Sequence, residues 1–135
     1  MSHNPAFLYV EDEQFSRVVM EMLVVRAMGY KNLTVFPNSE HFIQRVEALS
    51  TVPDIIFLDI HMQPINGFEM LALLRQHPTY ATTPVIALTA SVMNEEVDTL
   101  KTSGFNGAIA KPIDQTVFPG LVAQILKGEE VWHIV

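Results

Sequence analysis

The chain has 135 residues, of which 49% are hydrophobic and 17% charged, so a disordered, collagen-like or linker segment is excluded and one domain is expected. Its formal net charge of −7 comes from 15 acidic against 8 basic residues, and no basic cluster occurs, so direct nucleic-acid binding is not expected. The absence of cysteine excludes disulfides and cysteine-based metal or nucleophilic sites.

The apolar runs of the chain are all far shorter than the ~18 residues that a membrane span needs. The N-terminus has no basic region followed by a long apolar stretch, which a secretory signal would require. We therefore expect no membrane contact, and a cytoplasmic location.

Short runs of apolar, β-branched or aromatic residues alternate with segments of helical period. This pattern is typical of an α/β domain with a parallel sheet. The five runs predicted to be strands are residues 6–10, 33–36, 55–58, 85–88 and 108–110. The third and fourth are almost continuously hydrophobic, as central strands buried on both faces are.

A helix is predicted after each strand, and the expected signals for helix ends are present. The first helix carries one apolar stripe and should stop at Gly29, and Ser39 is the expected N-cap of the second. The third helix follows Gly67, the fourth spans residues 95–102 and the fifth begins near Thr116. Five βα units result, with no internal repeat and no linker.

The last eight residues, 128–135, lie outside these units, so we divide the chain into a domain at 1–127 and a C-terminal tail. One interpretation is that the apolar side chains of the tail fold back onto the domain. The other is that the tail is a partner-binding or dimerisation arm, because the only tryptophan, Trp132, lies among apolar neighbours.

Polar side chains follow four of the predicted strands: Glu11 and Asp12, Asp59, Thr89, and Lys111. Taken singly, each has an ordinary explanation as a helix cap, a turn residue or a solvated charge. In a doubly wound sheet, however, the carboxyl ends of the strands meet at one edge, where ligands bind. We therefore expect these five side chains to form one site.

Three carboxylates at one point would raise each other's pKa unless a cation lay between them. With oxygen ligands only, Mg²⁺ is the expected metal. Lys111 and Thr89 have the chemistry to bind phosphoryl oxygens, and Asp59 at the end of the central strand is then the expected acceptor of the phosphoryl group.

Four ordered segments carry a resemblance to a known family: LYVEDE at 8–13, DIIFLDIHM at 54–62 with Gly67, ALTA at 87–90 and AKPI at 110–113. Over residues 7–126 the chain resembles the receiver domain of bacterial two-component response regulators. The resemblance implies a flavodoxin-like (βα)₅ fold, in which a doubly wound, five-stranded parallel sheet has the strand order 2-1-3-4-5. It also implies a phosphoryl donor, the histidine of a sensor histidine kinase or of a histidine phosphotransfer protein.

The resemblance also implies roles for the site residues. Asp59 is the phosphoacceptor, and Thr89 and Lys111 hold the phosphoryl oxygens. Asp12 binds Mg²⁺ directly and Glu11 acts mostly through water. The implied metal site consists of Glu11, Asp12, Asp59 and the backbone carbonyl of His61.

The sequence departs from the family pattern at three places. The proline that usually follows the Met62 position is displaced by one, to Pro64. Ala108 replaces an aromatic residue whose rotamer normally couples to the Thr89 position, so that switch cannot operate. His61 and Ser91 occupy positions that tune the lifetime of the phosphoryl group.

The leading hypothesis is a stand-alone, non-enzymatic receiver that signals by binding an unknown partner, by dimerising or by passing the phosphoryl group onward. Dimerisation is plausible through the fourth and fifth helices or through the tail. A receiver excised from a hybrid kinase fits less well with the Met1 start and the distinctive tail. The alternative is a pseudo-receiver, a constitutive protein-interaction module, which Ala108 and Pro64 motivate. A small-molecule phosphatase or phosphotransferase fits less well, because His61 occupies the place of the second acid.

Overall fold

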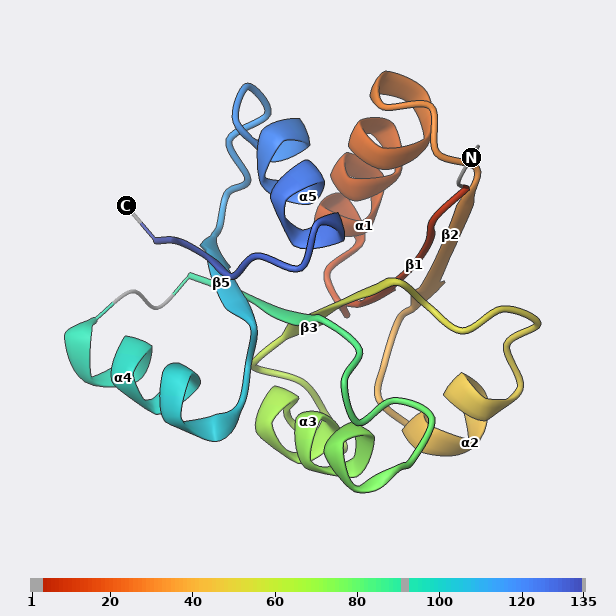
Figure 1. Cartoon of the computed structure of the whole chain (residues 1–135), viewed down its shortest axis with the longest axis vertical. Coiled ribbons are helices and arrows are strands. Elements are labelled where there is room, and N and C mark those ends of the chain that lie inside the picture. The colour runs from red at the N-terminus through yellow and green to blue at the C-terminus, as the bar shows by residue number, and fades with distance from the viewer. Residues whose placement is uncertain (1–3, 91–92, 135) are drawn as a thin grey trace.

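The computed structural model describes residues 4–90 and 93–134, and its centre is a parallel sheet (Figure 1). The strands are β1 (Ala6–Val10), β2 (Asn32–Phe36), β3 (Ile55–Asp59), β4 (Val85–Thr89), β5 (Gly107–Ala110) and β6 (Val131–His133). Their order is β2-β1-β3-β4-β5-β6, and every neighbouring pair is parallel. The doubly wound α/β fold and the order 2-1-3-4-5 of the first five strands are confirmed.

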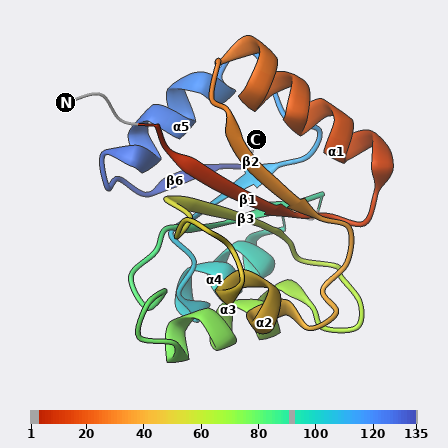
Figure 2. The ribbon, with the colours of Figure 1, turned by 90° about the vertical axis from the view of Figure 1, so that its right-hand side faces the viewer.

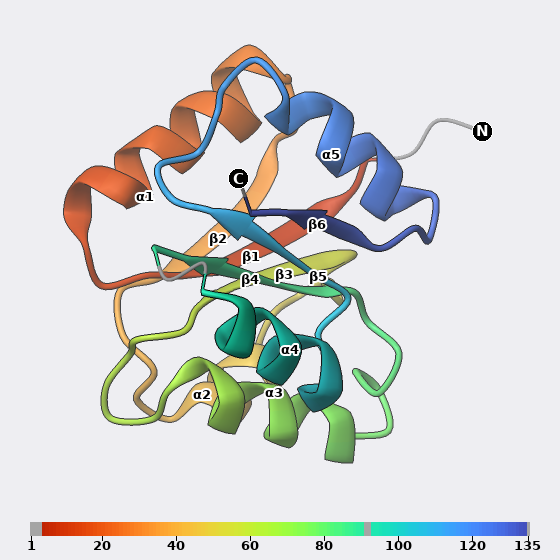
Figure 3. The ribbon, with the colours of Figure 1, turned by 90° about the vertical axis from the view of Figure 1, so that its left-hand side faces the viewer.

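Helices cover both faces of the sheet (Figures 2 and 3). On one face lie α1 (Gln14–Glu21), its π-helical continuation η1 (Met22–Ala27) and α5 (Phe118–Leu126). The other face carries α2 (Phe42–Glu47), α3 (Gly67–Gln76) and α4 (Asn94–Ser103). None of the helices in the described ranges is long and apolar enough to cross a membrane.

The core consists of two apolar layers, one on each side of the sheet. All five residues of β3 and of β4 are buried, and successive side chains alternate between the layers. Ile56 and Leu58 pack with α2, α3 and α4, whereas Ile55 and Phe57 pack with α1 and α5. This burial on both faces explains why these strands lack a polar alternation in the sequence.

The start of α3 shows how local sequence positions the site. Asn66 accepts a hydrogen bond from the Glu69 amide at 2.9 Å, and the Glu69 carboxylate accepts one from the Asn66 amide at 2.9 Å, which is a capping box. A side chain at Gly67 would lie 2.9 Å from the Cα of Ile60, so only glycine allows α3 to begin this close to the end of β3.

The expected role of Ser39 as the N-cap of α2 is wrong. The residue that precedes α2 is His41, in a left-handed conformation with φ of 48°. Ser39 is buried instead, where its hydroxyl donates to the Ile65 carbonyl at 2.7 Å and accepts from the Ile65 amide at 2.9 Å. It therefore joins the loop after β2 to the loop after β3.

The sheet has one strand more than the five predicted. Val131–His133, in the segment that we had placed outside the βα units, forms β6 and pairs with β5. Val131 packs into the core layer of α1 and α5, and Trp132 packs against the opposite layer. The tail therefore folds back onto the domain, and it does so by extending the sheet.

Candidate functional site

The five predicted side chains lie at the carboxyl ends of neighbouring parallel strands. Glu11 and Asp12 follow β1, Asp59 ends β3, Thr89 ends β4 and Lys111 follows β5. Glu11, Asp59 and Thr89 are buried, whereas Asp12 is exposed and Lys111 half-buried. Parallel pairing of these strands is what gathers residues separated by up to 100 positions.

Three carboxylates form an acidic cluster at this edge of the sheet. One oxygen from each of Glu11, Asp12 and Asp59 can be chosen so that all three lie within 4.8 Å of one another. Two of these groups are buried, and carboxylates this close repel one another. The arrangement therefore needs positive charge nearby.

Lys111 supplies one positive charge. Its ammonium group lies 2.8 Å from Oε1 of Glu11 and 3.3 Å from Oδ2 of Asp59. Burial disfavours the ammonium ion, but the hydrogen bond that it donates to Glu11 and the charges of both carboxylates outweigh this and raise the pKa of Lys111. Lys111 is thus a cation shared between the two buried acids.

The pKa values of the two buried carboxylates are shifted in opposite directions. Burial and the adjacent Glu11 raise the pKa of Asp59 to about 6. The amide of His61, which donates to Oδ1 at 3.0 Å, and the charge of Lys111 oppose this rise but do not cancel it. Burial also opposes ionisation of Glu11, but hydrogen bonding with Asp59, Lys111 and Tyr9 prevails and lowers the pKa of Glu11. Glu11 is therefore the group held as an anion.

Tyr9 is a site residue that the sequence analysis missed. Its hydroxyl donates to Oε1 of Glu11 at 2.7 Å, and its side chain is fully buried in β1. The other carboxylate oxygen of Glu11 accepts from the Glu13 amide at 3.2 Å. A sequence signal existed, because Tyr9 precedes Glu11 by two residues, which places both on one side of the extended chain, and a buried tyrosine hydroxyl requires a partner.

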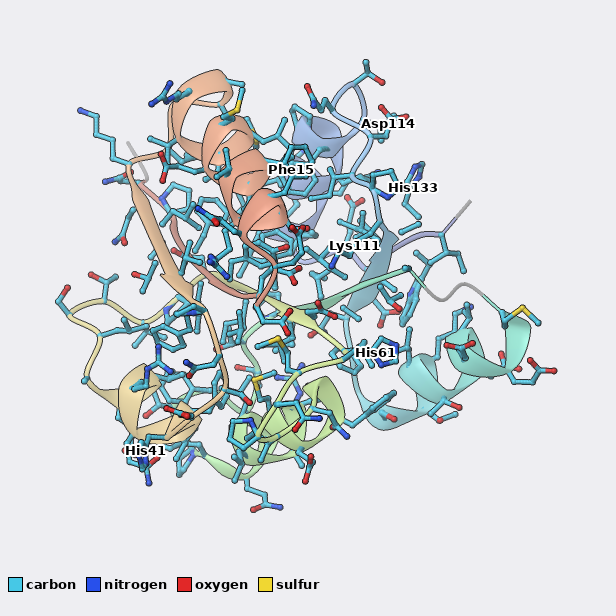
Figure 4. All side chains as sticks on the ribbon, turned by 180° about the vertical axis from the view of Figure 1, so that it is seen from behind. Phe15, His41, His61, Lys111, Asp114 and His133 are labelled. Carbon is cyan, nitrogen blue, oxygen red and sulfur yellow. The ribbon has the colours of Figure 1, made fainter. Side chains whose placement is uncertain are left out.

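Thr89 and His61 border the acidic cluster on the side of α4. The carbonyl of Thr89 accepts from the amide of Lys111 at 2.9 Å, which joins the ends of β4 and β5. A mainly apolar cavity of about 230 Å³ lies between these two residues and α4. Seen from behind, Lys111 lies between His61 and Phe15 of α1 (Figure 4).

The donor set fits a divalent hard cation. The acidic cluster offers three carboxylates, the only basic side chain paired with it among the described residues is Lys111, and carboxylate oxygens are preferred Mg²⁺ ligands. A single ammonium leaves the three carboxylates with excess negative charge. Glu11, Asp12 and Asp59 could therefore hold the metal, and the predicted contribution of the His61 carbonyl stays a prediction.

The departures from the family pattern are distributed around this site. Ala108 is fully buried in β5, and Pro64 follows a cis peptide bond after Gln63. Ser91, expected to affect the lifetime of the phosphoryl group, lies outside the described residues.

Several known proteins are similar to this chain in sequence. A two-component response regulator of rice, ORR41, is 30% identical over 108 residues, which cover 80% of this chain and 84% of that protein. An uncharacterised 14.6 kDa protein of Leptolyngbya boryana is 34% identical over 117 residues, 87% of this chain and 86% of its own. Histidine kinases of Escherichia coli and yeast also match, over 10% and 9% of their lengths.

A crystal structure of a putative response regulator from Chloroflexus aurantiacus superposes with a TM-score of 0.79 at 25% identity, covering 91% of this chain and 98% of that one. The sequence model of the response regulator receiver domain matches residues 7–123, which include every strand that contributes to the site. The chain therefore belongs to the response regulator receiver domain family.

Proposed function

We propose that the chain is a phosphorylation-dependent receiver in which Asp59 accepts a phosphoryl group from a phosphohistidine. The observation that carries the proposal is the position of Lys111, which lies within hydrogen-bond distance of the expected acceptor and of Glu11. A half-buried lysine shared by two buried carboxylates has little structural purpose, but it fits the charge of a phosphoryl group. The chain then acts as an acceptor and signalling module, not as an enzyme, with the cytoplasm as its expected location.

In the proposed transfer, an oxygen of Asp59 forms a bond to phosphorus while the bond from phosphorus to the donor histidine nitrogen breaks, and that nitrogen keeps the electron pair. Lys111 and Thr89 hold the phosphoryl oxygens. Glu11, Asp12, Asp59 and the His61 carbonyl would hold Mg²⁺, which supplies positive charge to the transferring group. Water later attacks the phosphorus and releases phosphate from Asp59.

The surface beside the site fits a helical donor protein. Phe15, Val18 and Met22 recur along one side of α1 and η1, and their side chains are 71%, 48% and 53% exposed. Phe15 and Lys111 line the same small pocket. A histidine kinase or histidine phosphotransfer protein that packs a helix here would bring its phosphohistidine beside Asp59.

Intact-mass analysis tests the acceptor. The protein is incubated with acetyl phosphate with and without Mg²⁺, in parallel with Asp59→Asn and, as a matched control, Asp98→Asn on the exposed side of α4. We expect one phosphoryl group on the wild type and on the Asp98 variant, requiring Mg²⁺ and removed by hydroxylamine. Retention of a hydroxylamine-sensitive phosphoryl group by the Asp59 variant would refute the assignment.

The donor surface has a separate test. Phe15→Ala should slow transfer from a purified histidine phosphotransfer protein while leaving the reaction with acetyl phosphate unchanged, because the small donor needs no docking surface. Equal slowing of both reactions would contradict the docking role.

The pseudo-receiver is the second candidate, and the buried Ala108 in β5 favours it. In that case the protein would acquire no phosphoryl group under conditions that phosphorylate a control receiver. The α1 face and the C-terminal strand would then be the surfaces through which a constitutive partner binds.

A further inference from the structure

The C-terminal strand β6 occupies the outer edge of the sheet, next to β5 (Figure 3). It has only three residues, and the register pairs Ala108 with Trp132 and Ile109 with His133. The amide of Val131 donates to the Asn106 carbonyl at 3.3 Å. A three-residue strand at an edge pairs with a neighbour on one side only, so opening it locally costs less free energy than opening a central strand.

Gly107 shows that β5 is shaped to receive this strand. A Cβ at Gly107 would collide with the Val131 carbonyl oxygen and lie 3.1 Å from Cγ2 of the same residue. All three nearest atoms belong to Val131, so a residue without a side chain at this position allows the close approach of β6. The docking of β6 is therefore a built feature of the sheet.

Trp132 connects β6 to α4. Its register partner Ala108 has a small side chain, and the indole packs against the core layer that contains Ala108 and Leu100. The ammonium group of Lys101 lies 5.2 Å from the centre of the indole ring, which is a cation–π contact. The indole nitrogen donates to Glu130 at 3.0 Å.

Helix α4 also borders the phosphoacceptor site, across the cavity of about 230 Å³. Thr89 and His61 line this cavity from the site, and Glu96 and Leu100 line it from α4. Because the space is not filled by packed side chains, α4 has room to move toward Thr89. Leu100 and Lys101 are adjacent, so movement of α4 toward the cavity displaces Lys101 relative to Trp132.

We propose that β6 is a releasable strand: filling the Asp59 site draws α4 toward Thr89, separates Lys101 from Trp132 and loosens the docking of β6 on β5. This inference rests on the proposed function, because phosphorylation of Asp59 is the event that fills the site. It gives the module an output although Ala108 is too small to act as an aromatic switch. The tail is thus both the cover of the β5 edge and the segment that is released.

Trp132 is the only tryptophan, so its fluorescence reports directly on β6. The protein is incubated with acetyl phosphate and Mg²⁺, and intact mass, tryptophan emission and hydrogen exchange are measured on the same sample, with Asp59→Asn as the control. We expect emission at longer wavelength and about two- to fivefold faster exchange at 131–133, the size of one lost, partly exposed cation–π contact. The Asp59 variant should show neither change.

The outcomes separate the two proposals. A mass gain with unchanged emission and exchange would overturn the release of β6 and leave the phosphoacceptor intact. No mass gain would overturn both. Slower exchange at 131–133 after phosphorylation would also refute the inference, because it would mean that the strand docks more tightly.

Reciprocity provides a second test. If filling the site releases β6, then releasing β6 must favour filling the site. Gly107→Ala should shift the emission of Trp132 without any ligand and bind beryllofluoride, a phosphoryl mimic, about two- to fivefold more tightly. Gly120→Ala on α5, where an added Cβ meets nothing within 4 Å, is the matched control and should change neither.

Should Gly107→Ala fail to fold, Lys101→Ala removes the cation–π contact with Trp132 from the exposed side of α4 and should also make beryllofluoride bind more tightly. Unchanged affinity in both folded variants, or weaker affinity in either, would refute the coupling between β6 and the site.

Discussion

Replacing Asp59 by asparagine should stabilise the metal-free protein at neutral pH, although it removes the proposed acceptor. Asp59 is a buried carboxylate beside a second buried carboxylate, Glu11, and the two share one ammonium group. Asparagine has nearly the same shape and keeps an acceptor for the His61 amide, which donates to Asp59 at 3.0 Å. The substitution therefore removes mainly the charge.

The magnitude follows from the pKa of Asp59, which is raised from 3.8 to about 6. At about 1.4 kcal/mol per pKa unit, ionised Asp59 costs about 3 kcal/mol of folding free energy at pH 7.5. This cost already includes the favourable charge of Lys111, whose ammonium group lies 3.3 Å from Asp59. We therefore expect the variant to be about 3 kcal/mol more stable, or about 10 °C in Tm for a chain of this length.

The sign of the pH dependence is fixed by the same pKa. Between pH 3.8 and about 6 the folded state binds more protons at Asp59 than the unfolded state does, so the stability of the wild type falls as the pH rises through this range. At pH 4.5 Asp59 is protonated in the folded protein, and its cost drops to about 1 kcal/mol. The stability advantage of the variant should then fall to about 1 kcal/mol.

Urea unfolding in EDTA at pH 4.5 and 7.5 measures this difference, with Asp98→Asn as an exposed control. Saturating Mg²⁺ at pH 7.5 should stabilise the wild type more than the Asp59 variant and so reduce the difference in their free energies of unfolding. Two results would refute charge repulsion in the acidic cluster. One is an Asp59 variant that is less stable than the wild type at pH 7.5, and the other is the same stability difference between the two proteins at both pH values.

Three further predictions concern the site and its supports. Lys111→Ala should slow phosphorylation by acetyl phosphate at least about tenfold while Mg²⁺ binding persists in calorimetry, because the acidic ligands remain; a normal rate would contradict its role. Gly67→Ala should destabilise the fold by about 1–3 kcal/mol in urea unfolding, since the new Cβ would lie 2.9 Å from Ile60. Asn66→Ala, which breaks the capping box with Glu69, should cost about 1 kcal/mol in the same assay, and no loss would mean that the cap contributes nothing.

Much of the fold could be predicted because its signals are local. The continuous hydrophobicity of β3 and β4 follows from burial on both faces, and the polar residues at the strand ends follow from their place at the edge of the sheet. Once the strands were assigned, the parallel topology brought Glu11, Asp59 and Lys111 together without further information. Periodicity and position sufficed for these features.

The features that were missed depend on partners distant in the sequence. Serine is a common helix cap, but the hydroxyl of Ser39 both donates to and accepts from the backbone of Ile65, 26 residues away, instead of capping α2. Segment 131–133 is too short for a periodic signal, and its strand identity comes from the space left by Gly107. Tyr9 was predicted only as part of the strand at residues 6–10, and the structure pairs its hydroxyl with Glu11.

Tyr9 explains how the charges of the site could be redistributed in the proposed phosphorylation. Lys111 is already bound by Glu11 and Asp59, so in the proposed transfer it would give up part of these contacts to reach the phosphoryl oxygens. A buried carboxylate that lost its only hydrogen-bond donor would destabilise the folded protein. Glu11 still accepts from the Tyr9 hydroxyl at 2.7 Å and from the Glu13 amide at 3.2 Å, so it remains satisfied as an anion. Because the Tyr9 hydroxyl stays bound to Glu11, the ammonium group of Lys111 could move toward the phosphoryl charge proposed at Asp59 without leaving Glu11 unsatisfied.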